Sequence, residues 1–126
     1  MEQKYNWENK TIIIAEDVES NYQYLKAALS KTKINILWAK DGEEAINLFK
    51  NNKINMILMD IQMPVLNGLL ATKAIKKIDK NVPIVAVTAY AMAGDREKSL
   101  AAGCDDYAAK PIRLNVLYSL IEKHLI

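Results

Sequence analysis

Several features that mark other classes of protein are scarce in this sequence. It has one cysteine, Cys104, so no disulfide can form within the chain, and we expect a reducing, cytoplasmic compartment. No apolar run is long enough to cross a bilayer, and residues 1–10 are too polar for a signal peptide. The formal net charge is only +2 at pH 7. We therefore expect no contact with nucleic acid or with a membrane surface.

What is present is typical of one globular domain. The chain has 126 residues, of which 51% are hydrophobic and 25% are charged. A chain of this length buries roughly two thirds of its unfolded surface and needs no disulfide or metal to hold its core. Residues 1–10 are expected to form a tail or linker, with Trp7 as a possible anchor, and residues 11–126 the domain.

Short apolar runs alternate with helical patterns along that domain. The expected strands are 11–15, 34–38, 54–59, 84–87 and 104–109, and the expected helices are 18–30, 41–49, 66–78, 92–102 and 113–125. This alternation predicts an α/β fold, a doubly wound parallel sheet with helices on both faces. The first, third and fourth strands are the most apolar and should be central, which gives the order 2-1-3-4-5.

The apolar spacing also predicts which side of each helix faces the sheet. In the third helix we expect Leu70, Ala74, Ile75 and Ile78 to face inward, and Lys73, Lys76, Lys77 and Lys80 to form a solvated face. In the last helix the expected inward stripe is Leu114, Leu117, Tyr118, Ile121 and Leu125. The sole histidine, His124, lies near the end of that helix, where it would favour the helix dipole.

Polar side chains follow four of the expected strands. Glu16 and Asp17 follow the first strand, Asp60 the third, Thr88 the fourth and Lys110 the fifth. Parallel strands bring their carboxyl ends to one edge, and the predicted order opens a crevice there, between strands one and three. These side chains should therefore meet in one site.

The chemistry of that set favours phosphoryl transfer. Three clustered carboxylates repel one another, so the site needs a cation, a protonated carboxyl or free access of water. Oxygen ligands suit Mg²⁺, and the ammonium of Lys110 and the hydroxyl of Thr88 suit phosphoryl oxygens. Asp60 would then be the nucleophile that forms an aspartyl phosphate.

At these residues the chain resembles the receiver domain of two-component response regulators, which has a flavodoxin-like fold. The resemblance rests on Glu16-Asp17, on Asp60-Ile61-Gln62-Met63-Pro64 with Gly68, on Thr88-Ala89 and on Lys110-Pro111, and it covers nearly the whole chain after residue 10. It implies a phosphoacceptor signalling domain that catalyses only its own phosphorylation and dephosphorylation, and is otherwise not an enzyme.

The resemblance also implies a role for each residue. Asp60 accepts a phosphoryl group from a phosphohistidine, and Thr88 and Lys110 hold its oxygens. Mg²⁺ is bound by Asp17, by Asp60, by the backbone carbonyl of Gln62 and, through water, by Glu16. Lys110-Pro111 is a cis peptide. Tyr107 moves inward as Thr88 moves to the phosphate, which changes the face formed by the fourth helix, fifth strand and fifth helix.

A finer resemblance points to receivers of hybrid sensor histidine kinases. It lies in residues 91–98 and 102–107, together with Glu16-Asp17 and Asn21. It implies a histidine kinase or a histidine phosphotransfer domain as partner, a place in the cytoplasmic part of a membrane sensor kinase, and a monomer or weak dimer. Gln62 and Tyr90, two residues after Asp60 and Thr88 respectively, lie at positions that vary across the family and tune dephosphorylation.

Other interpretations stay open at this point. Asp60 and Glu16-Asp17 could merely cap helices, and Thr88, Tyr107 and Lys110 could be ordinary packing or surface residues. A Mg²⁺-dependent phosphohydrolase would want an aspartate at position 62, which here is Gln62. A flavin or nucleotide carrier would need a phosphate-binding loop where Glu16-Asp17-Val18-Glu19 stands. The last alternative is an inert docking module.

Overall fold

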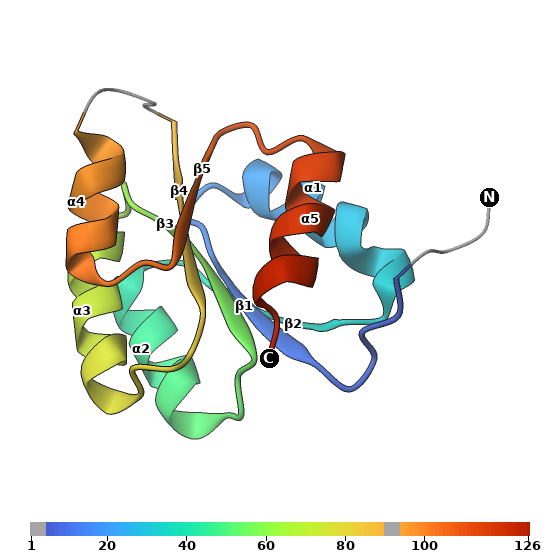
Figure 1. The fold of residues 1–126 in the computed structure, drawn as a ribbon, viewed down its shortest axis with the longest axis horizontal. Helices are drawn as coiled ribbons and strands as arrows, with labels where there is room; N and C mark the ends of the chain where they lie inside the picture. Colours follow the sequence, from blue (N-terminus) through green and yellow to red (C-terminus); the bar gives the residue numbers. More distant parts are fainter. Residues whose placement is uncertain (1–4, 90–93) are drawn as a thin grey trace.

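The computed structural model describes residues 5–89 and 94–126, and within them it forms the predicted parallel sheet (Figure 1). The five strands lie in the order β2-β1-β3-β4-β5. The elements are β1 (Thr11–Ala15), α1 (Glu19–Leu29), the 3₁₀ turn η1 (Ser30–Thr32), β2 (Asn35–Ala39), α2 (Gly42–Asn51), β3 (Met56–Asp60), α3 (Gly68–Ile78), β4 (Ile84–Thr88), α4 (Asp95–Ala102), β5 (Asp106–Ala109) and α5 (Leu114–His124). The predicted fold and strand order are confirmed.

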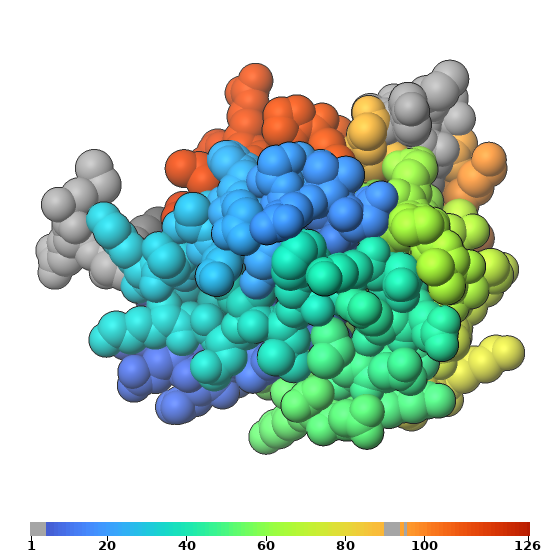
Figure 2. Space-filling model, turned by 180° about the vertical axis from the view of Figure 1, so that it is seen from behind, coloured from blue at the N-terminus to red at the C-terminus, as the bar shows by residue number. Residues whose placement is uncertain are grey.

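The helices form one layer on each face of the sheet. Figure 1 shows α1 and α5 on one face and α2, α3 and α4 on the other. From behind, α1 lies at the centre of the surface, with α2 below it (Figure 2). Successive strand residues face opposite layers: Ile12 and Ile14 pack toward α1 and α5, whereas Ile13 and Ala15 pack toward α2 and α3. The sheet is thus buried on both faces, which explains its continuous apolar runs.

No described helix combines the length and apolar character needed to cross a membrane.

Some helix and strand boundaries differ from the predicted ones because hydrogen bonds at the helix ends set them. The third helix was expected from residue 66, but α3 begins at Gly68, because the side chain of Asn67 accepts a hydrogen bond from Leu70 N and caps it. The last strand was expected from residue 104, but Cys104 N donates to Ser99 O and belongs to the turn that ends α4. The predicted start of the fourth helix, at residue 92, lies outside the described residues.

The predicted inward face of α3 was partly wrong. Leu70 and Ile78 are 49% and 50% exposed, whereas Ala71, Thr72 and Ile75 are fully buried. The reason is Gly68: a Cβ at that position would lie 2.1 Å from Asp60 O, so the helix approaches β3 through its glycine. That approach turns Gly68 and the residues three, four and seven positions later toward the sheet. In α5, likewise, Leu117 and Ile121 are buried, but Leu114 is 46% exposed.

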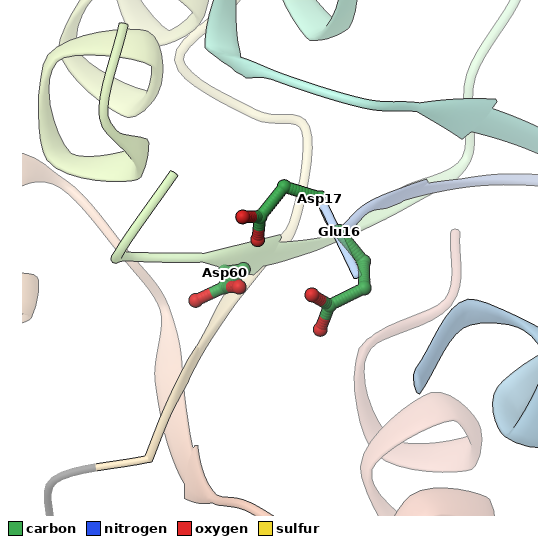
Figure 3. A group of neighbouring side chains, drawn as sticks. All are labelled: Glu16, Asp17 and Asp60. Carbon is green, nitrogen blue, oxygen red and sulfur yellow. The ribbon is translucent and has the colours of Figure 1, made fainter. Parts of the chain in front are cut away.

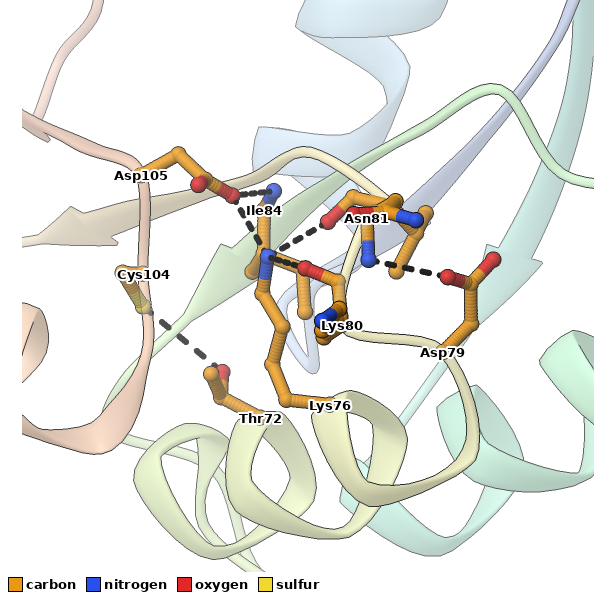
Figure 4. Close-up of polar contacts among 9 residues, drawn as sticks. Thr72, Lys76, Asp79, Lys80, Asn81, Ile84, Cys104 and Asp105 are labelled. Atoms are coloured by element: carbon orange, nitrogen blue, oxygen red, sulfur yellow. Dashed lines mark hydrogen bonds and ion pairs between the residues drawn. The ribbon is translucent and has the colours of Figure 1, made fainter.

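Lys76 is not part of the solvated face predicted for α3. Its ammonium donates to Val82 O (2.7 Å) and Lys80 O (3.2 Å) and pairs with Asp105 Oδ2 (2.8 Å). That carboxylate also accepts from Ile84 N, as Figure 4 shows. Lys76 therefore joins α3 to the beginnings of β4 and β5. The other lysines predicted for this face, Lys73, Lys77 and Lys80, are exposed.

Part of the N-terminal segment packs on the domain. Trp7 N donates to Thr32 O (2.7 Å), and the indole packs against the core between the sheet and the α1–α5 layer. Tyr5 stacks on Trp7 at 4.9 Å and lies 5.5 Å from the ring of Tyr118 on α5. The boundary at residue 10 stays a prediction.

Candidate functional site

Asp60 is held rigidly at the end of the central strand β3. Its side chain is buried, and its Oδ1 accepts a hydrogen bond from Gln62 N (3.0 Å). The chain beyond it is fixed from two sides, because Ile61 N donates to Val87 O and Gly68 N donates to Ile61 O. The carboxylate therefore sits at the carboxyl edge of the sheet, as predicted.

Two further acidic residues reach the same point from β1. Glu16 is 2% exposed, its Oε2 accepts from Val18 N (3.0 Å), and its backbone carbonyl accepts from Trp38 Nε1 (2.8 Å). Asp17 is exposed. Carboxylate oxygens of Glu16, Asp17 and Asp60 all lie within 4.8 Å of one another (Figure 3). The structure thus brings together the predicted acidic cluster.

Lys110 supplies the opposing charge. Its Nζ lies 2.6 Å from Glu16 Oε1 and 2.8 Å from Asp60 Oδ2. The bond between Lys110 and Pro111 is cis, as predicted. One ammonium therefore bridges the two buried carboxylates, while the third, Asp17, faces solvent.

The electrostatics of the site follow from this burial. Burial raises the pKa of Asp60 to about 6, and the charge of Glu16 adds to the effect, while Lys110 and the Gln62 N–H oppose it. Burial alone would lower the pKa of Lys110, but its bonds to Asp60 and Glu16 outweigh this and raise it. Lys110 is therefore firmly protonated, and at neutral pH Asp60 is largely ionised and poised to take a cation or an electrophile.

Thr88 and Gln62 meet beside the carboxylates. Thr88 ends β4, is fully buried, and its Oγ1 donates to Gln62 Oε1 (3.0 Å). The Thr88 hydroxyl is therefore hydrogen-bonded to the side chain of Gln62, the residue whose backbone N–H binds Asp60 Oδ1. Tyr107, one strand further, is half-buried and packs against the core on the α2–α4 side.

Two side-chain contacts were not foreseen in the sequence, one beside the site and one at the opposite edge of the sheet, where β5 begins. The indole of Trp38 donates to Glu16 O, and its ring stacks on Tyr22 at 4.2 Å. His124 Nε2 lies 2.8 Å from Asp106 Oδ2 and ties α5 to β5. Neither pair is close in sequence, so no local pattern signals it.

Comparisons with known proteins place the chain among signalling domains. The family model for the response regulator receiver domain matches residues 12–122. The chain is similar to hybrid signal transduction histidine kinase I of Dictyostelium discoideum, with 46% identity over 123 residues, which is 90% of this chain. It spans only 7% of the length of that kinase.

Two solved structures have the same fold and appreciable identity. One is the Saccharomyces cerevisiae co-crystal of the histidine phosphotransfer protein Ypd1 with the receiver domain of the response regulator Ssk1. The match has a TM-score of 0.88, 34% identity, and coverage of 97% of this chain and 91% of that one. The other is the receiver domain of the sensor histidine kinase PA1611 from Pseudomonas aeruginosa PAO1, with magnesium in its active site cleft. That match has a TM-score of 0.85 and 34% identity, and it covers 91% of this chain and 96% of that one.

Proposed function

Because the chain belongs to the response regulator receiver domain family, a family of phosphoacceptors in two-component signalling, we propose that Asp60 is its phosphoacceptor. The observation that carries this is the convergence of Glu16, Asp17 and Asp60 within 4.8 Å, with Lys110 Nζ 2.8 Å from Asp60 Oδ2. Asp60 Oδ attacks the phosphorus of a phosphohistidine, the N–P bond breaks, and the imidazole leaves with the electron pair.

The acidic cluster fits Mg²⁺. It offers oxygen donors only, and its two buried carboxylates share a single ammonium, so a divalent cation would relieve their repulsion. Asp17 and Asp60 would bind it through carboxylates, Gln62 through its carbonyl, and Glu16 through water. The bound ion would neutralise charge on the phosphoryl oxygens.

Lys110 and Thr88 would hold the transferred group. Lys110 keeps its charge in the site and needs only to move from the Asp60 carboxylate to a phosphoryl oxygen. The Thr88 hydroxyl would exchange Gln62 Oε1 for a second phosphoryl oxygen. Tyr107 would follow Thr88, which alters the face formed by α4, β5 and α5.

We also propose a wider setting for the domain. A histidine kinase or a histidine phosphotransfer domain would be the donor or acceptor, as the similarity to the Ypd1–Ssk1 structure and to a hybrid kinase supports. Residues 11–126 would form the receiver, in the cytoplasm and as a monomer or weak dimer. Beyond its own phosphorylation and dephosphorylation the domain would have no enzymatic activity.

The test is the intact mass of the protein after incubation with Mg²⁺ and acetyl phosphate. We expect one added phosphoryl group, dependent on Mg²⁺ and absent from Asp60→Asn. The matched control is Asp79→Asn, because Asp79 lies in the turn after α3, where it accepts from Asn81 N. Equal labelling of Asp60→Asn and the control would disprove the assignment.

A further inference from the structure

Both polar backbone groups of Glu16 are bound by β2, the edge strand next to β1. Glu16 N donates to Ala39 O (2.9 Å), and Glu16 O accepts from the indole Nε1 of Trp38 (2.8 Å). The backbone pairing of β1 and β2 ends at Ala15 and Ala39, and two residues later Asp41 caps α2. The chain has then left the sheet, so a side chain supplies the donor that a longer strand would have offered from its backbone.

The carbonyl bound by Trp38 belongs to the peptide group that joins Glu16 to Asp17. A peptide group is planar and turns as one unit, so the direction of its carbonyl sets where the Cα atom and side chain of Asp17 lie. Oxygens of both carboxylates lie within 4.8 Å of the Asp60 carboxylate, and Figure 3 shows both side chains leaving the end of β1. The indole therefore acts on the point of the backbone from which two of the three acidic side chains depart.

The indole of Trp38 is itself fixed in orientation. Its ring stacks on Tyr22 of α1, with the ring centres 4.2 Å apart and the planes inclined by 4°. Tyr22 is 7% exposed, and the ammonium of Lys40 lies 5.1 Å from the centre of the Trp38 ring. The stacking and the cation–π contact leave the ring little freedom, so its N–H is aimed at the carbonyl before a metal ion binds.

Asp17 depends on this backbone more than the other two acidic residues do. Glu16 and Asp60 are buried, and each has a carboxylate oxygen paired with Lys110. Asp17 is exposed, so solvent rather than packed side chains surrounds its carboxylate. Because an exposed side chain samples several rotamers, the position of its backbone decides how often its carboxylate meets that of Asp60.

We propose that Trp38 is a positioning residue of the Mg²⁺ site. Its indole N–H holds the peptide group between Glu16 and Asp17 in the orientation that lets Asp17 and Asp60 bind one ion. Trp38 acts through this peptide group and contacts neither the ion nor the phosphoryl group. The inference rests on the proposed function, in which the acidic cluster binds Mg²⁺.

The test removes the N–H and keeps an aromatic ring. Trp38→Phe can still stack on Tyr22, but it offers no donor to Glu16 O. Removing a hydrogen bond that orients a metal ligand typically weakens metal affinity roughly 10–100-fold. Glu16 N keeps its own bond to β2, so we expect the lower end of that range, a Kd for Mg²⁺ about tenfold weaker. The amide NMR signals of Asp17 and Gln62 follow the titration.

Trp7→Phe is the matched control. It makes the same substitution at the other tryptophan of the chain, which packs against the same core cluster but outside the site. Its affinity for Mg²⁺ should equal that of the unmodified chain. Equal affinities of Trp38→Phe and Trp7→Phe would overturn the inference and leave the proposed function standing. An unmodified chain that binds no Mg²⁺ would instead overturn the proposed metal site and the inference with it.

Labelling of Asp60 by acetyl phosphate separates positioning of the metal site from a defect in the transfer step. A weakened metal site is refilled at high Mg²⁺ concentration. The labelling rate of Trp38→Phe, measured by intact mass, should therefore be about tenfold lower at Mg²⁺ concentrations well below the Kd, and this deficit should shrink toward saturation. A deficit of the same size at every Mg²⁺ concentration would contradict the positioning role, because it would place the loss in phosphoryl transfer itself.

The unmodified chain provides a test that needs no substitution. Coupling between two binding events is reciprocal, so an indole hydrogen bond that favours Mg²⁺ binding must in turn be favoured by Mg²⁺. We expect exchange of the Trp38 Nε1 hydrogen with water, measured by NMR, to slow by about the same tenfold factor when Mg²⁺ saturates the site. Exchange of the Trp7 indole hydrogen should not change. An equal exchange rate of the Trp38 hydrogen with and without Mg²⁺ would overturn the inference.

Discussion

At the scale of single residues, Lys110 is the charge on which the stability of the acidic site depends. It bridges Glu16 and Asp60, which are 2% and 3% exposed, at 2.6 and 2.8 Å. Removing one partner of a buried ion pair is costly because the remaining charges lose their compensation. We expect Lys110→Met to lower the free energy of unfolding in urea by about 3 kcal/mol without Mg²⁺.

Mg²⁺ provides the control for that prediction. A bound divalent ion would replace the lost ammonium, so part of the loss should be recovered in its presence. Lys73→Met, on the exposed side of α3, should change stability by less than about 0.5 kcal/mol. If Lys110→Met behaves like Lys73→Met, the bridging role is wrong.

The raised pKa of Asp60 predicts how Mg²⁺ affinity depends on pH. Burial moves this pKa from 3.8 to about 6, and only the ionised carboxylate binds the metal. Below about pH 6 protons therefore compete with Mg²⁺, and above it they do not. We expect the Kd for Mg²⁺ to be about tenfold weaker at pH 5 than at pH 7.5.

Trp38 offers the signal for this titration, because its indole donates to the carbonyl of Glu16. The measurement uses Trp38 fluorescence in a Trp7→Phe background, which leaves one tryptophan in the chain. An affinity that stays unchanged between the two pH values would show that the Asp60 pKa is not raised.

At the scale of elements, Lys76 links α3 to the edge of the sheet at which β4 and β5 begin. Its side chain is 14% exposed, and its ammonium reaches two backbone carbonyls and Asp105. Asp105 is 40% exposed, so solvent screens that pair, and the carbonyl bonds carry most of the effect. We expect Lys76→Met to lower the free energy of unfolding by about 2 kcal/mol, measured by urea denaturation.

Lys77 provides a matched control for this element. It is the next residue of α3 and is exposed. Lys77→Met should therefore be nearly neutral, within about 0.5 kcal/mol. Similar losses for the two variants would mean that the contacts of Lys76 do not stabilise the junction of α3, β4 and β5.

At the scale of the whole molecule, the question is whether the N-terminal segment unfolds together with the domain. Trp7 packs against the core of the α1–α5 layer and stacks on Tyr5, although it precedes the first strand. We expect Trp7→Ala to cost about 2 kcal/mol, less than a fully buried tryptophan. Circular dichroism during urea unfolding measures this without relying on tryptophan emission.

Glu8→Ala, at an exposed position of the same segment, is the control and should be nearly neutral. Labelling of Asp60 should be unchanged in both variants, because Trp7 lies outside the site. If Trp7→Ala is as stable as Glu8→Ala, residues 1–10 act as the tail that the sequence indicated.

The parallel sheet, its strand order and the place of the acidic cluster were all predictable from the sequence. Each depends on local signals: β-branched runs, helical spacing and polar residues at strand ends. In a parallel sheet the carboxyl ends of the strands share one edge, so the polar residues that follow the strands come together there. The positions of Glu16, Asp17, Asp60 and Lys110 therefore followed from the order of elements.

Only the tertiary structure decided the contacts between distant residues. The close approach of Gly68 to Asp60 O sets the rotation of α3, which leaves Leu70 exposed. Lys76 forms an ion pair with Asp105, which lies 29 residues later in the chain. The Thr88–Gln62 and Trp38–Glu16 hydrogen bonds depend in the same way on how strands and helices pack. Sequence patterns record which face of an element is apolar, whereas the rotation of a helix and the reach of a side chain are settled by the neighbours it meets.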